Sequence, residues 1–153
     1  MERVRHSSTK VVKKPWGQEM WLADGRETPY ALKRITFLAG MRSSLQVHQY
    51  KFETNHVLSG SGIFLLSESP INVMDYLGSD DRINLEEKIY SDLREIELVP
   101  EMVIDVPPGY VHRVLARTDL VFIECSSIEL DDVIRISDDS GRGNGRIDSE
   151  HRH

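Results

Sequence analysis

The chain is a succession of short segments rich in β-forming residues, separated by glycine, proline, asparagine and aspartate. This alternation predicts the strands of a sandwich or small barrel, because the separating residues favour turns. The expected strands are 19–22, 30–37, 45–50, 54–59, 62–67, 94–98, 102–106, 112–116 and 120–126. So many short strands fit an all-β jelly roll, in which two sheets pack on each other.

Two stretches depart from this pattern. The stretch 67–94 contains a polar loop and several charged residues, and we expect an extra hairpin or a short helix that lies over one sheet. The tail 137–153 is rich in Asp, Gly, Arg and His, so we expect most of it to be mobile. The sequence thus predicts one domain over 1–153 with its core at about 12–136, a size that buries a real core.

Charge and apolar content exclude several function classes. The formal net charge is -6 and no run of Lys and Arg is long enough to bind nucleic acid, so nucleic acid is not an expected partner. The apolar runs are too short to span a bilayer, and the N-terminus lacks the apolar core of a signal peptide. We therefore expect a cytoplasmic protein without a membrane partner. The lone Cys125 lies in an apolar run and is expected to be a buried small hydrophobe.

Metal-ligating side chains gather in two separate regions. Gln46 and His48 share one face of an expected strand, because alternate side chains point the same way. Glu53 follows after a bend, and His112 comes from a distant segment. Such a mixed nitrogen and oxygen set suits one divalent metal ion and leaves positions open for water or substrate. Zn is the first choice, with Mn, Fe or Ni as alternatives.

The spacing of these residues resembles the first motif of the cupin superfamily. That motif runs from a glycine through His-x-His and a glutamate to a second glycine, and its places are occupied by Gly40, Gln46, His48, Glu53 and Gly60. Gln46 stands where most cupins have the first histidine. The resemblance implies the double-stranded β-helix of the cupins, with these residues as metal ligands.

The second cupin motif, Pro-x-Gly-x-x-His, is matched less completely. Pro107, Gly109 and His112 occupy its places, and the resemblance makes His112 the remaining metal ligand. Glu101 and Ala116 stand where a glycine and an asparagine are expected. These two departures affect turn and strand positions and leave the ligands intact.

Within the cupins, the chain is most similar to the mannose-6-phosphate isomerase type. The similarity covers residues 12–142 and includes Lys14-Pro15-Trp16-Gly17, the glutamine at position 46 and the closing segment 129–135. Lys51 replaces the usual Arg and Asn55 the usual Trp. The resemblance implies a metal-dependent sugar or sugar-phosphate isomerase or epimerase that acts through a metal-bound enediolate. It also implies a homodimer, since small cupins frequently pair through an outer sheet.

Three further residues are candidates for proton transfer or substrate binding. Lys33 and Arg34 are adjacent in one expected strand, so only one of them faces the interior. Glu124 lies in an otherwise apolar strand and is either a general base or the partner of a buried Lys or Arg. Tyr50 is expected in core packing or at the pocket mouth, whereas His56 is expected to point away from the site.

Two other functions remain open. A non-catalytic binder of a sugar or nucleotide sugar fits the small size and the lack of an Arg cluster for phosphate. An iron-dependent dioxygenase is a common use of the cupin site, but Gln46 counts against it. In the leading hypothesis the partner is a small sugar or sugar phosphate.

Overall fold

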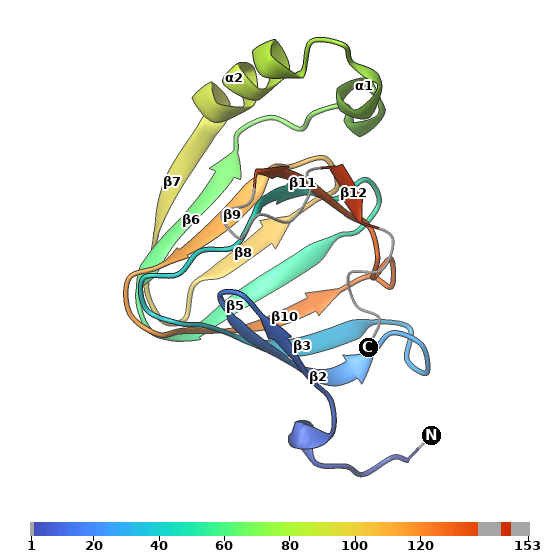
Figure 1. Ribbon diagram of the computed structural model, residues 1–153. Coiled ribbons are helices and arrows are strands. Elements are labelled where there is room, and N and C mark those ends of the chain that lie inside the picture. The colour runs from blue at the N-terminus through green and yellow to red at the C-terminus, as the bar shows by residue number, and fades with distance from the viewer. Residues whose placement is uncertain (1, 138–144, 148–153) are drawn as a thin grey trace.

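Two six-stranded antiparallel sheets face each other in the computed structural model, which describes residues 2–137 and 145–147 (Figure 1). A 3-10 turn, Ser7–Thr9, precedes them. The first sheet has the order β1 (Val11–Lys14), β2 (Gly17–Asp24), β3 (Ala31–Phe37), β10 (Leu120–Ser126), β5 (Glu53–Ser59) and β8 (Val103–Val106). The second has the order β12 (Gly145–Ile147), β11 (Val133–Ser137), β4 (Leu45–Val47), β9 (His112–Ala116), β6 (Gly62–Ser67) and β7 (Leu93–Leu98).

The all-β class and the double-sheet architecture are confirmed. The strands expected at 62–67, 112–116 and 120–126 have the observed bounds of β6, β9 and β10. The strand expected at 45–50 ends at Val47, because the backbone from residue 49 to 51 is bound to a side chain instead of a neighbouring strand. Strands β1, β11 and β12 were not expected.

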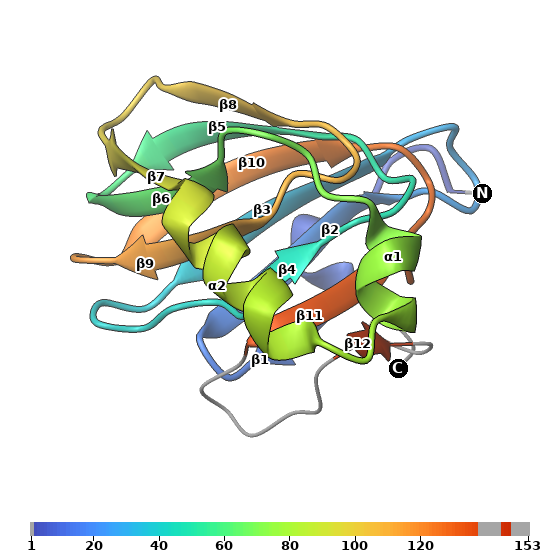
Figure 2. The same ribbon diagram turned by 90° about the horizontal axis from the view of Figure 1, so that it is seen from above.

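The stretch 67–94 forms two helices, α1 (Val73–Gly78) and α2 (Arg82–Asp92), in place of a hairpin. Asn72 caps α1, since its Oδ1 accepts a hydrogen bond from the backbone N–H of Asp75 at 3.0 Å. The helices lie across one end of the second sheet (Figure 2). Their contact is apolar and joins Val73, Tyr76 and Ile89 to Leu45, Val47, Val111, Ile134 and Ile136. The helices therefore cover the outer face of β4, which carries Gln46, and of β11, together with Val111 next to His112.

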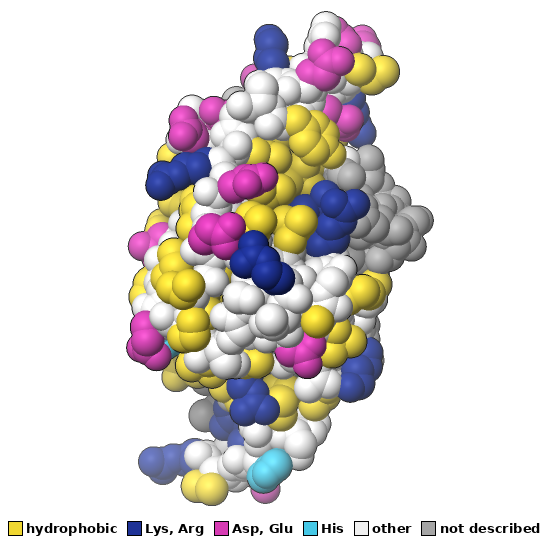
Figure 3. Space-filling model, turned by 90° about the vertical axis from the view of Figure 1, so that its left-hand side faces the viewer, with side chains coloured by type: hydrophobic (Ala, Val, Ile, Leu, Met, Phe, Trp, Pro, Cys, Tyr) yellow, Lys and Arg dark blue, Asp and Glu magenta, His cyan; other side chains and the backbone are white. Residues whose placement is uncertain are grey.

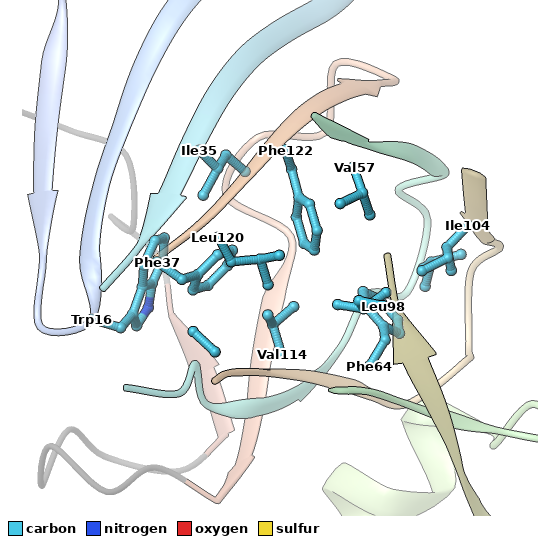
Figure 4. Close-up of a cluster of buried hydrophobic side chains, with 12 residues drawn as sticks. Trp16, Ile35, Phe37, Val57, Phe64, Leu98, Ile104, Val114, Leu120 and Phe122 are labelled. Atoms are coloured by element: carbon cyan, nitrogen blue, oxygen red, sulfur yellow. The ribbon is translucent and has the colours of Figure 1, made fainter. Parts of the chain in front are cut away.

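The main hydrophobic core fills the space between the two sheets (Figure 4). The first sheet contributes Ile35 and Phe122, and the second contributes Phe64 and Val114. Trp16 closes one end by stacking on Phe37 with the ring centroids 4.2 Å apart. These side chains set the distance between the two sheets.

Two tight turns show why the cupin motifs place glycine where they do. Gly60 has a φ of 92°, and a Cβ at this position would lie 2.1 Å from the carbonyl oxygen of Asp119. Glu101 has a φ of 77° and is the one non-glycine with positive φ among residues 2–137 and 145–147. It stands where the second motif has a glycine, so the turn keeps a conformation that glycine adopts without strain.

Two expectations from the sequence need correction. Cys125 is exposed, because its neighbour Glu124 takes the inward direction on β10. Residues 145–147 pair with β11 as strand β12, so the expectation of mobility does not hold for them. The rest of the tail, 138–144 and 148–153, lies outside the described residues.

One face of the outer surface gives little direct indication of a partner. Side chains of both charge signs are interspersed with apolar ones on the face that Figure 3 shows. Within the part of the chain that the structure describes, neither length nor hydropathy qualifies any helix to cross a membrane.

Candidate metal centre

Three of the expected ligands converge inside the fold. His48, Glu53 and His112 are buried, and one ligand atom from each lies within 4.8 Å of the others. Glu53 opens β5 and His112 opens β9, so the two sheets each supply one ligand at the same end of the sandwich. Nε2 of His112 lies 3.2 Å from Oε1 of Glu53, and Nε2 of His48 lies 3.9 Å from Oε2.

Gln46 stands beside this triad. It is the register partner of His112 between β4 and β9, and its Nε2 lies 3.5 Å from Nε2 of His112. Its Oε1 accepts a hydrogen bond from the Ser44 hydroxyl at 3.1 Å. A hydroxyl also accepts hydrogen bonds, so the amide keeps this partner when it turns its oxygen toward the triad. Gln46 is therefore placed to serve as a fourth ligand.

Backbone carbonyls fix both histidines in the form that binds a metal. Nδ1 of His48 donates to the carbonyl oxygen of Asp132 at 2.6 Å, and Nδ1 of His112 donates to that of Tyr110 at 3.1 Å. Each Nε2 then presents a lone pair. Nε2 of His48 is buried without a hydrogen-bond partner among the described residues. Burial, followed by the charge of Lys51, lowers the pKa of His48 to about 3, so this ring stays neutral.

This donor set fits a divalent ion. Nε2 of His48 and Nε2 of His112 both lie beside the Glu53 carboxylate, and Nε2 of His48 has no hydrogen-bond partner among the described residues. A cation between these atoms would be attracted by all three groups. Nitrogen and oxygen ligands in this combination are those that Zn, Mn, Fe and Ni accept.

Asp132 supports the ligands from behind. Its Oδ1 accepts from the N–H of Gln49 at 3.1 Å, and its Oδ2 accepts from the N–H groups of Tyr50 and Lys51 at 2.5 and 2.9 Å. Its carbonyl oxygen also holds His48. Asp132 thus fixes the segment between the candidate ligands His48 and Glu53. This is a structural role for the closing segment 129–135, to which Asp132 belongs.

Next to the ligands lies a group of buried charges that we call the ionic cluster: Glu19, Lys33, Lys51, Glu53 and Glu124. Nζ of Lys51 lies 3.4 Å from Oε2 of Glu53 and 3.3 Å from Oε1 of Glu124. Nζ of Lys33 lies 3.7 Å from the same Glu124 oxygen and 3.7 Å from Oε2 of Glu19. Every member therefore has an opposite charge nearby, as buried ions require.

The structure separates the two basic residues expected near the site. Lys33 is buried and points inward, whereas Arg34 is exposed and directs its guanidinium to the sulfur of Met20. Only one of the two faces the interior, as strand alternation predicts, and the structure does not bring Arg34 to the site. Glu124 faces inward and contacts both lysines. Burial, followed by the charge of Glu53, raises the pKa of Glu124.

The outcomes for Tyr50 and His56 differ. Tyr50 is 64% exposed, so core packing was the wrong expectation; its strand has already ended and the side chain turns outward. His56 points away from the site as expected and lies 3.5 Å from Glu101 at the surface.

Sequence reasoning missed Lys51, Asp132 and Glu19 as parts of the site. Lys51 offered a signal, because it lies between the ligands His48 and Glu53 at a position where the similar isomerases have Arg. Glu19 offered none, since its contact with the site depends on how β2 packs beside β3.

Two small adjoining lobes form the cavity at this centre. Their volumes are about 50 Å³ and about 60 Å³, and Gln46, Glu53 and Glu124 line both. His48, Lys33 and Lys51 line the first lobe, and His112 lines the second. The candidate ligands and the ionic cluster therefore share one space.

No protein-family model matches this sequence, and no curated protein does. Solved structures are similar in fold. CapF from Staphylococcus aureus, a capsular polysaccharide assembling protein, matches with 19% identity and a TM-score of 0.59 over 84% of this chain and 34% of that chain. KdgF from Halomonas sp. matches with 16% identity and a TM-score of 0.58 over 82% and 91%. Ectoine synthase from P. lautus matches with 11% identity and a TM-score of 0.59 over 82% and 78%.

These neighbours are cupin-fold proteins, so the fold expected from the sequence, the cupin jelly roll, is confirmed. Identities this low show the fold alone. The chain spans about a third of the length of CapF, 34%. The chain therefore has the cupin jelly-roll fold with a candidate metal centre inside it.

Proposed function

We propose that this cupin is a metal-dependent isomerase or epimerase of a sugar or sugar phosphate, of the mannose-6-phosphate isomerase type and acting in the cytoplasm. The observation that carries the proposal is the common cavity of the candidate ligands and the pair Lys51 and Glu124. Isomerisation needs an electrophile at a carbonyl oxygen and a group that moves a proton between neighbouring carbons. Both kinds of group face this cavity.

Each residue has a chemical task in this proposal. A divalent ion would be held by Gln46, His48, Glu53 and His112 and would supply Lewis acidity. Glu124 moves the proton, because a carboxyl group with a raised pKa is a better base and exchanges protons more readily near neutral pH. Lys51 offsets negative charge that develops on the substrate. Lys33 holds Glu124 in position.

A second candidate function is a non-catalytic binder of a sugar or nucleotide sugar. The observation in its favour is that Glu124 has two lysine partners, 3.3 and 3.7 Å away, which also suits a purely structural ion pair. The two functions differ in proton chemistry alone. An iron-dependent dioxygenase would require strict dependence on ferrous iron and oxygen.

Proton NMR in deuterium oxide tests the proposal. The protein is loaded with Zn, Mn, Fe or Ni and mixed with aldose and ketose sugars and their phosphates, and the loss of the C2 proton signal is followed. Metal-dependent exchange on one compound supports isomerase chemistry. Absence of exchange on every compound, with binding still detected, supports the binder.

His112→Ala connects the metal to the activity. We expect this variant to lose metal and proton exchange together, because it removes one of two imidazole ligands. His56→Ala is the matched control, since His56 lies at the surface, away from the ligands, and both readouts should stay at the wild-type level. An active His112→Ala variant without metal would contradict the mechanism.

We also propose that the protein forms a homodimer. Strand β1 lies at one of the two edges of the first sheet, and such an edge offers unpaired backbone groups to a second copy. Light scattering after size-exclusion chromatography measures the mass directly. A monomer mass near 17.6 kDa at micromolar concentration would refute this proposal.

A further inference from the structure

The charges that line the two lobes cancel. The charged lining residues are the three lysines Lys14, Lys33 and Lys51 and the three glutamates Glu19, Glu53 and Glu124. Both ligand histidines have Nδ1 bound to a carbonyl oxygen, so they add no charge in the metal-binding form. A divalent ion then leaves the cavity with an excess of two positive charges.

An excess of positive charge in a buried cavity has a large effect. The five members of the ionic cluster are at most 7% exposed, so water screens them little. A neutral sugar would leave this excess uncompensated, whereas an anionic oxygen group would reduce it. Protonation of any of the glutamates would make the excess larger, so its sign does not depend on their titration.

Lys51 is the cation best placed to meet such a group. Its ammonium has three N–H donors and two carboxylate neighbours, Glu53 at 3.4 Å and Glu124 at 3.3 Å, so one donor is left for a further acceptor. Lys33 is more committed, because it lies between Glu19 and Glu124 and over the ring of Trp21 at 4.4 Å. A substrate oxygen near Glu53 would therefore lie close to the metal position and to Lys51 at once.

The size of the lobes favours one kind of anion. Each lobe is small, with a volume of about 50 or 60 Å³. A planar carboxylate places two oxygens in such a space. A tetrahedral phosphate with its ester carbon needs more room in every direction.

We propose that the substrate of this site carries a carboxylate beside its reacting carbons, so that it is a small hydroxy acid or oxo acid of the sugar-acid class, with Lys51 as the residue that selects it. This inference rests on the proposed function in taking the cavity as the substrate site. It goes further because it places the anionic group at the reacting end and excludes neutral sugars.

Calorimetric titration of the zinc-loaded protein with lactate and lactamide tests the inference. The two compounds have nearly the same shape and differ in charge, and we expect lactate to bind at least tenfold more tightly. Methyl phosphate is the third probe. Equal affinities for lactate and lactamide overturn the proposal, and tighter binding of methyl phosphate than of lactate overturns the assignment to a carboxylate.

Lys51→Met separates the lysine from the metal, which by itself prefers a carboxylate. We expect the affinity for lactate to fall at least tenfold and that for lactamide to stay unchanged, with one zinc still bound per chain. Lys88→Met, on the exposed face of α2, is the matched control and should behave as wild type. Unchanged lactate affinity in Lys51→Met refutes the role of Lys51. If Lys51→Met does not fold, the affinities of the wild-type protein for lactate, lactamide and methyl phosphate still test whether the site prefers a carboxylate.

The result is distinguishable from failure of the proposed function. Proton exchange on a neutral sugar without any preference for lactate would leave the isomerase standing and refute the inference. A strong preference for lactate with no proton exchange on any sugar, sugar phosphate or sugar acid would support the inference and refute the isomerase.

Discussion

The two ends of the space between the sheets differ in chemistry although the same strands build both. On β3, Lys33 lies at one end and Phe37 at the other. On β10, Glu124 lies opposite Lys33, and Leu120 lies opposite Phe37. The inward rows of β5 and β9 change in the same direction, from Glu53 to Val57 and from His112 to Val114 and Ala116. Each strand therefore has a charged end and an apolar end.

This division separates stability from function. The apolar end buries large side chains without polar atoms, and such burial is the dominant favourable contribution to folding. The charged end removes ions from water, which costs free energy that the ion pairs recover only in part. Buried charges that reduce stability are expected where a protein needs them for its function. The charged side chains at inward positions, where apolar ones are expected, therefore mark the candidate site.

Phe122→Ala tests the apolar end and has the largest expected effect. Phe122 is 1% exposed and contacts the ring of Phe37 edge-on, so we expect a loss of about 3–5 kcal/mol in the free energy of unfolding. Denaturant titration measures this loss. At low temperature the folded fraction should still bind one metal ion, because Phe122 is not one of the candidate ligands.

Phe52→Ala is the matched control for this variant. The Phe52 side chain is 46% exposed, and we expect a change of less than about 1 kcal/mol in the free energy of unfolding. Equal losses in the two variants would show that the apolar end is no more important to stability than the surface.

Asp132→Asn tests the charged end without touching a ligand. The amide keeps the shape of the side chain but loses the charge that accepts N–H bonds from Gln49, Tyr50 and Lys51. We expect metal affinity to fall about 10- to 100-fold, because such supporting residues orient the ligands. Competition with a chelator of known affinity measures the change. Wild-type affinity would show that the backbone of this segment is rigid without the carboxylate.

Glu101→Gly tests the turn that follows β7 at the apolar end. The φ of 77° disfavours a residue with a side chain, so we expect the variant to be more stable by about 1 kcal/mol. Thermal unfolding measures the gain. Glu101→Gln keeps the strained backbone and loses only the charge near His56, so it should show no gain. Equal stability of both variants would mean that the turn carries no strain.

The sequence predicted the fold and the grouping of the candidate ligands, because the strand pattern and the spacing within each motif are local features. Strand alternation places Gln46 and His48 on one face, and turn glycines such as Gly60 end the strands that follow. The ligand triad of the structure consists of three of the four residues that the motifs indicate, and the fourth, Gln46, lies next to it. Their role as metal ligands stays a prediction.

The ionic cluster was harder to predict because it depends on contacts between distant strands. Glu19 and Lys33 meet because β2 and β3 are neighbours, and Lys33 meets Glu124 because β3 pairs with β10. Alternation alone left open which of Lys33 and Arg34 faces inward. Strand β12 was missed since its segment lies in a polar tail, and it forms by pairing with β11, which in turn pairs with β4.

Arg34→Gln has the smallest expected effect and isolates the alternation itself. Arg34 and Lys33 are neighbours in sequence with the same charge, but the Arg34 side chain is exposed and its described polar contact is the sulfur of Met20. We therefore expect a change of less than about 0.5 kcal/mol in the free energy of unfolding and no change in metal affinity. Lys33→Gln, in contrast, removes a positive charge that lies 3.7 Å from both Glu19 and Glu124, so it should lower stability and alter the site. Denaturant titration and metal titration of both variants measure these effects. Similar results for Arg34→Gln and Lys33→Gln would mean that the effect of a charge on β3 does not depend on whether its side chain points inward or outward.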